Sequence, residues 1–171
     1  EYPRHGVSRL TSLSDEIAVE VKGISYFYGD RTALGDVSMN ILRGEMFGVV
    51  GPNGSGKSTL FRILATLLPP ARGTACVLGE SVTTRAKQVR GKIGVVFQDS
   101  ILDGKLTLKE NLIHHGHLYG MWGKALRRRV DELLAMTRLE ERRNDRVETL
   151  SGGLRRRGEL AECLMHGPPV L

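Results

Sequence analysis

Two stretches near the start of the chain alternate hydrophobic with polar residues. They are residues 17–22 and 37–42, and this period of two predicts strands that each bury one face. Turn-forming pairs, Gly29-Asp30 and Arg43-Gly44, come after them. The pattern therefore predicts a small antiparallel sheet.

The following part of the chain mixes apolar runs with helical periodicity. Residues 45–50 are almost continuously apolar, which is typical of a strand buried on both faces in a parallel sheet. A helical pattern then stops at Pro69-Pro70, because proline cannot continue a helix. The predicted elements are strands at 45–50, 74–78 and 92–97 and helices at 57–68 and 84–90.

Only helical patterns follow residue 97 until the last residues of the chain. Thr107 and Glu110 have the spacing of a capping box, in which each side chain satisfies an orphan amide of the other residue, so a helix is expected from there to about residue 119. A second helix is expected over residues 124–136 and a third after Ser151, a good N-cap. Val170-Leu171 then begins a further apolar run.

These elements predict an α/β fold. We expect a loose leader at residues 1–16 and one domain over 17–171, with a mostly parallel sheet, the small antiparallel sheet, and a helical subdomain at about 100–155.

A glycine-rich motif joins the strand predicted at 45–50 to the helix that follows it. It fits the pattern GxxxxGK[ST] of the P-loop, whose backbone amides hold phosphate at the positive end of a helix. The lysine of this pattern reaches the β and γ phosphates, and the following hydroxyl enters the shell of Mg²⁺. The motif indicates a P-loop NTPase core that binds nucleoside triphosphate, and its residues are Gly51, Pro52, Asn53, Gly54, Ser55, Gly56, Lys57, Ser58 and Thr59.

A second potential phosphate site lies about a hundred residues later. Ser151, Gly152 and Gly153 stand at the start of the last predicted helix, where the helix dipole favours an anion. A simple P-loop kinase or GTPase has no need of this second segment.

Composition narrows the possible partners. The formal net charge is +6, which suits an acidic partner, but aromatic residues make up 5% of the chain and are not interleaved with the basic ones. We therefore expect no nucleic-acid partner. The two cysteines lie in apolar contexts without metal-site spacing and are expected to be reduced core residues of a cytosolic protein.

With these motifs, residues 18–171 resemble the ATP-binding cassette (ABC) family. The resemblance makes residues 51–59 the Walker A loop and 150–153 the LSGG signature, so ATP and Mg²⁺ are the implied cofactors. It also implies that Gln98 is the Q-loop glutamine, which contacts Mg²⁺ and the attacking water, and that Tyr28 stacks on adenine. Lys57 and Gln98 are then the implied catalytic residues, and Ser58 and Gln98 the implied metal contacts. In this family one ATP is held between the Walker A loop of one subunit and the signature of another, so a head-to-tail dimer is implied.

The amino-acid sequences of several segments are similar to those of the ATPases of bacterial drug-export and related ABC-2 type systems. These segments are 44–48, 63–68, 102–107, 110–112 and 151–157, with Leu154 where most signatures carry glutamine. The resemblance implies an ATP-binding subunit that couples ATP hydrolysis to export through a separate membrane permease, on the cytoplasmic face of the membrane.

The family's Walker B aspartate, catalytic glutamate and switch histidine would follow Val170-Leu171 and do not occur in the 171 residues. We therefore expect a fold that is incomplete at its C-terminal end and a chain that hydrolyses little ATP by itself. Two alternatives stay open: a non-transport ABC ATPase, and a non-catalytic nucleotide-binding fragment.

Overall fold

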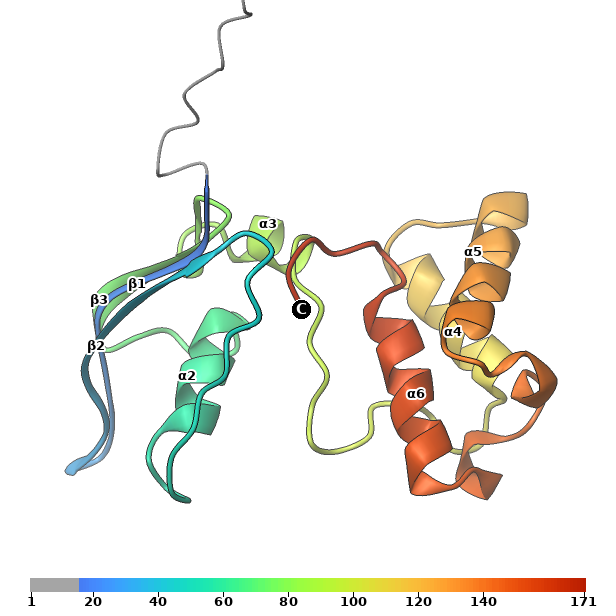
Figure 1. Ribbon diagram of the computed structural model, residues 1–171, viewed down its shortest axis with the longest axis horizontal. Coiled ribbons are helices and arrows are strands. Elements are labelled where there is room, and N and C mark those ends of the chain that lie inside the picture. Colours follow the sequence, from blue (N-terminus) through green and yellow to red (C-terminus); the bar gives the residue numbers. More distant parts are fainter. Residues whose placement is uncertain (1–15) are drawn as a thin grey trace, which may run out of the picture. The chain divides into compact units, whose positions relative to one another are not determined.

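The computed structural model describes residues 16–171, which form two compact units. The first unit ends at Arg90 and the second spans Gly91–Leu171. The first contains a sheet and short helices, and the second is helical (Figure 1).

The first unit is built on a four-stranded antiparallel sheet. The strands are β1 Ile17–Tyr28, β2 Arg31–Leu42, β3 Arg72–Val77 and β4 Glu80–Ser81, in the order β2-β1-β3-β4. β1 and β2 form a hairpin whose turn is the predicted Gly29-Asp30 pair, and Gly29 has a φ of 57° that favours glycine. The predicted small antiparallel sheet is confirmed, and both strands of its hairpin are longer than the alternating stretches indicated.

Helix α2, Lys57–Leu64, follows the glycine-rich loop, and α3, Ala86–Arg90, closes the unit. Ile63 of α2 is fully buried and Leu60 nearly so, and the helix contacts β2 and β3. The same core contains Val21 and Ile24 of β1. α2 ends earlier than predicted, because the chain turns at Thr66, which has a φ of 62°.

Two predicted strands are absent from the described residues, and with them the mostly parallel sheet. Residues 45–50 form no ladder, and Met46 and Val50 are 99% and 96% exposed. Residues 92–97 form only one parallel bridge, between Ile93 and Val170. The strand predictions were wrong because an apolar run becomes a strand only when neighbouring backbone accepts and donates its hydrogen bonds.

The second unit packs three helices around one core (Figure 1). They are α4 Leu108–Leu118, α5 Gly123–Met136 and α6 Gly152–Cys163, with short 3₁₀ turns at Glu140–Arg142 and Val147–Thr149. The three predicted helices are confirmed. The capping box is also formed, with the Thr107 amide donating to Glu110 at 2.8 Å and the Glu110 amide donating to Thr107 Oγ1 at 3.2 Å. Buried side chains from all three helices make the core: Leu108, Leu112, Leu126, Val130, Leu133, Leu134 and Ala161.

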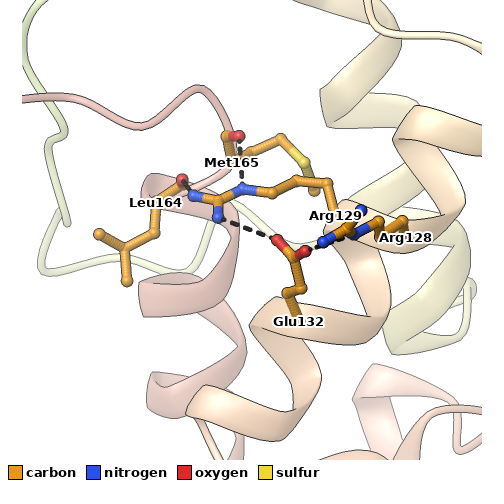
Figure 2. Close-up of polar contacts among 5 residues, drawn as sticks. All are labelled: Arg128, Arg129, Glu132, Leu164 and Met165. Atoms are coloured by element: carbon orange, nitrogen blue, oxygen red, sulfur yellow. Dashed lines mark hydrogen bonds and ion pairs between the residues drawn. The ribbon is translucent and has the colours of Figure 1, made fainter.

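An arginine of α5 fixes the carboxyl end of α6. Arg129 donates from Nη2 to the Leu164 carbonyl at 2.7 Å and from Nε to the Met165 carbonyl at 3.2 Å, and it pairs with Glu132 at 3.5 Å (Figure 2). The last carbonyls of a helix have no partner within it, so this guanidinium both satisfies them and complements the helix dipole.

Two acidic residues of α6 are buried. Glu159 and Glu162 resemble solvated-face charges in sequence, yet they are only 5% and 7% exposed. Each has a cationic or titratable partner that sequence spacing did not indicate: Arg156 lies 2.8 Å from Glu159, and His115 Nδ1 lies 2.9 Å from Glu162. Pairing makes the burial of both carboxylates tolerable.

Candidate functional site

The glycine-rich loop packs closely on strand β2 at Gly56. This residue is the N-cap of α2, has a φ of 87°, and contributes no side-chain cap to the helix. A Cβ built on Gly56 would clash with the Ala33 carbonyl oxygen and lie 2.7 Å from Leu34 Cδ2. Glycine is therefore required here by both conformation and space. The result is a helix N-terminus whose first amides have no side-chain acceptor.

Lys57 lies over the loop that precedes it. Its Nζ donates to the carbonyl oxygens of Gly51 and Pro52, both at 2.6 Å, and lies 3.3 Å from Ser55 Oγ. An ammonium has three donors, and these three oxygens hold it at the mouth of the loop. Phosphate oxygens are stronger acceptors than carbonyls for such a donor, so the lysine is placed to exchange partners when an anion enters.

A pocket of about 350 Å³ opens beside this loop within the first unit. It gathers most of the residues that the sequence assigned to nucleotide binding, including Tyr28, which is 23 residues before the loop begins. Gly51, Pro52 and Ser55 do not line it, but they contact Lys57, which does. The lining residues are Tyr28, Arg31, Ala33, Asn53, Gly54, Gly56, Lys57, Ser58, Thr59 and Arg62.

The pocket is cationic. Arg31, Lys57 and Arg62 line it, and none of the described residues that line it is acidic. Arg31 Nη2 also contacts the Gly54 carbonyl at 3.5 Å. These positive charges are not balanced by negative side chains in the described lining, so the pocket favours an anionic ligand.

Sequence reasoning missed both arginines of the pocket. Arg31 pairs directly with Tyr28 across the hairpin, so a two-residue turn at Gly29-Asp30 was enough to bring them together. Arg62 comes four residues after Ser58 on α2, a spacing that places two side chains on the same helix face. Both signals are local and could have been used.

Tyr28 ends strand β1 and is 46% exposed. Tyr26 meets it edge to face, with ring centroids 5.0 Å apart. This contact orients the Tyr28 ring, while the exposed area leaves room for a planar group to stack on it.

The remaining predicted residues belong to the second unit. Ser151 is the N-cap of α6 and accepts a hydrogen bond from the Leu154 amide at 3.4 Å, as its sequence position indicated. Gly152 and Gly153 are exposed, and a Cβ on either would meet nothing within 4 Å. Gln98 lies in the segment that α6 contacts, because Arg156 donates to the carbonyl of Phe97.

The chemistry of these groups fits a magnesium nucleotide. Backbone amides, Lys57 and the two arginines suit phosphate, and the Ser58 hydroxyl is an oxygen ligand of the kind that Mg²⁺ accepts. The part of the chain that the structure describes contains no group of three histidine, cysteine or acidic residues that could hold a metal. Mg²⁺ would therefore depend on the phosphate oxygens of its nucleotide, as it commonly does. None of the described helices is long and apolar enough to cross a membrane.

Residues 34–171 match the family described as ABC transporter. Nod factor export ATP-binding protein I of Sinorhizobium fredii (strain NBRC 101917 / NGR234) is 41% identical over 162 residues, which are 95% of this chain and 47% of that protein. The protein of the same name from Bradyrhizobium diazoefficiens is 40% identical over 155 residues, covering 91% of this chain and 51% of the relative. The chain spans about half the length of these curated relatives.

Solved structures agree with the sequence match. CbiO1 from Clostridium perfringens, part of the ABC transporter complex cbiONQ, superposes with a TM-score of 0.79 at 29% identity over 90% of this chain and 63% of its own. The ATP-binding cassette MJ0796, a dimer in a post-hydrolysis state with ADP and Pi, gives 0.78 at 32% identity over 89% of this chain and 72% of its own. These similarities confirm the predicted P-loop NTPase fold. The chain belongs to the ABC transporter family.

Proposed function

We propose that this chain is the nucleotide-binding part of an ATPase subunit that drives export through a membrane permease. The observation that carries the proposal is the cationic pocket in which the glycine-rich loop, Lys57 and Tyr28 come together. Its lining matches the chemistry of ATP from end to end, with cations for the triphosphate and an exposed aromatic ring for the base.

Each residue has a role that follows from its chemistry. The loop amides and the N-terminus of α2 hold the phosphates, while Lys57 leaves the carbonyls of Gly51 and Pro52 for the β and γ oxygens. Ser58 and Gln98 supply oxygen ligands for Mg²⁺, and Tyr28 stacks on adenine. Mg²⁺, when bound, neutralises charge that develops on the transferred phosphoryl group.

The second unit supplies a surface for another subunit in this proposal. Ser151, Gly152 and Gly153 open α6 with exposed backbone amides, which suits the triphosphate bound by a second ATP-binding domain in a head-to-tail dimer. The dimeric state of the related cassette MJ0796 supports this arrangement. Nucleic acid is not a proposed partner.

The proposed direction of transport is inferred from the names of the relatives. Proteins that are 38–41% identical to this chain are called Nod factor export ATP-binding proteins, which supports export and a permease partner. With such a partner the subunit works at the cytoplasmic face of the membrane. We propose no particular transported substrate, because the permease selects it. Drugs are one class of substrate that the family resemblance suggests.

Binding and hydrolysis are separate parts of the proposal. Hydrolysis needs an oriented base, and none of the described residues that line the pocket is an acid that could act as that base. The 171-residue polypeptide is expected to bind ATP and to release phosphate no faster than its Lys57→Ala variant. A malachite-green assay that finds several-fold faster release by the wild type would refute this second part.

Equilibrium binding of a fluorescent ATP analogue with Mg²⁺ tests the first part. Lys57→Ala removes charge-assisted hydrogen bonds worth about 1.5–3 kcal/mol, or roughly a 10- to 150-fold weaker Kd. Lys87→Ala is the matched control, because Lys87 is an exposed residue of α3 that does not line the pocket. Equal affinity of wild type and Lys57→Ala would refute the proposed site.

A further inference from the structure

A side chain of α6 contacts the backbone immediately before Gln98. Arg156 Nη1 donates to the Phe97 carbonyl oxygen, across 59 residues of sequence and entirely within the second unit. The Phe97 carbonyl and the Gln98 amide belong to one planar peptide group. The orientation of this carbonyl therefore fixes the peptide plane that contains the Gln98 nitrogen and Cα. The contact therefore bears on where Gln98 can place its amide.

The guanidinium is itself held in place by a buried carboxylate. Glu159 Oε2 accepts from the same Nη1 of Arg156 at 2.8 Å, and the Glu159 side chain is only 6% exposed. A buried carboxylate is costly without a partner, and Arg156 is the cation paired with it in the described chain. The two residues are three apart on α6, which keeps them on one face of a rigid helix.

We propose that Arg156 is a positioning residue for Gln98 and that Glu159 orients Arg156 for this task. The inference rests on the proposed role of Gln98 as a Mg²⁺ contact. Ser151 is the N-cap of the same helix, so a displacement of α6 when its N-terminus engages a nucleotide also moves the group that holds Phe97. The structure thus links the signature segment to Gln98 through a named side chain.

The test compares nucleotide affinity with and without the metal. The Kd of a fluorescent ATP analogue is measured for the 171-residue chain in excess Mg²⁺ and in EDTA. The Mg²⁺ gain is the factor by which Mg²⁺ lowers the Kd relative to EDTA. Loss of an outer partner of a metal ligand typically weakens metal affinity about 10- to 100-fold, so the Mg²⁺ gain of Arg156→Gln should be about tenfold smaller than that of the wild type. Its Kd in EDTA should stay at the wild-type value, because Gln98 does not act without metal.

Three further variants separate positioning from general damage. Arg157→Gln removes the same charge from the next, exposed position of α6 and should keep the full Mg²⁺ gain. Arg156→Lys retains a donor and should lose less of the gain than Arg156→Gln. A double variant, Arg156→Gln with Glu159→Gln, leaves no unpaired buried charge. It should therefore fold even if the single variant does not, and it should lose the same share of the Mg²⁺ gain.

Hydrogen exchange of residues 95–101 gives an independent readout. Exchange should be faster in Arg156→Gln and unchanged in Arg157→Gln. An unchanged Mg²⁺ gain in both Arg156→Gln and the double variant would overturn the inference, as would an equal loss in Arg157→Gln. If the wild type binds no nucleotide under either condition, the proposed function fails and the Mg²⁺ role of Gln98 falls with it, whereas the exchange comparison still decides whether Arg156 holds the segment.

Discussion

Replacing Gly56 by alanine tests the close packing that shapes the phosphate loop. The φ of 87° at this position costs an L-residue about 1–2 kcal/mol. The new methyl also clashes with the Ala33 carbonyl and lies 2.7 Å from Leu34 Cδ2, and forced overpacking costs about 1–3 kcal/mol. Together these give a loss of about 2–5 kcal/mol in the free energy of unfolding.

Gly44→Ala is the matched control for this experiment. Gly44 has a φ of 76°, but a Cβ built there meets nothing within 4 Å, so it carries the conformational cost alone. Urea unfolding followed by circular dichroism should place Gly56→Ala about 1–3 kcal/mol below Gly44→Ala. Gly56→Ala should also bind ATP more weakly, because relief of the clash moves the N-terminus of α2 and Lys57 with it. Equal destabilisation of the two variants would refute the close approach of Gly56 to β2.

Two further predictions concern the second unit. Arg129→Ala should lower its free energy of unfolding by about 1–3 kcal/mol, because carbonyls at the end of α6 lose their donor, whereas Arg128→Ala, at a side chain 84% exposed, should change little (Figure 2). Urea unfolding of the two variants decides this. Burial lowers the pKa of His166 below its ordinary 6.5, so the folded state favours the neutral ring. The neutral ring therefore contributes to stability above pH 6.5, and this contribution is lost as the pH falls through the lowered pKa. An NMR titration midpoint for His166 at or above 6.5 would contradict this assignment.

The local features of the site could be read from sequence. The loop at 51–59 and the Ser151 cap depend on neighbouring residues only, and both are formed. The structure also places Tyr28 in the same pocket as Lys57. Arg31 and Arg62 were missed because no motif names them, although hairpin register and helix spacing pointed to each.

Features that depend on distant partners were harder to predict. Residues 45–50 and 92–97 are apolar enough for strands, but a parallel strand exists only between neighbours, and the described residues supply one bridge at Ile93. The burial of Glu159 could not be predicted from the sequence for a related reason. Its burial depends on the packing of α6 against Leu102 and Leu108 at neighbouring Gly158 and on the position of Arg156, none of which a charge pattern shows.

The most direct test of the proposed site is hydrogen exchange of the chain with and without magnesium ATP. Magnesium ATP bound in this pocket should slow exchange in two segments of the first unit: the loop with the start of α2, residues 51–60, and the hairpin turn at residues 28–33, which contributes Tyr28 and Arg31 to the pocket. Lys57→Ala should lose both protections. Protection confined to other segments, or equal protection in wild type and Lys57→Ala, would contradict the claim that this pocket holds the nucleotide.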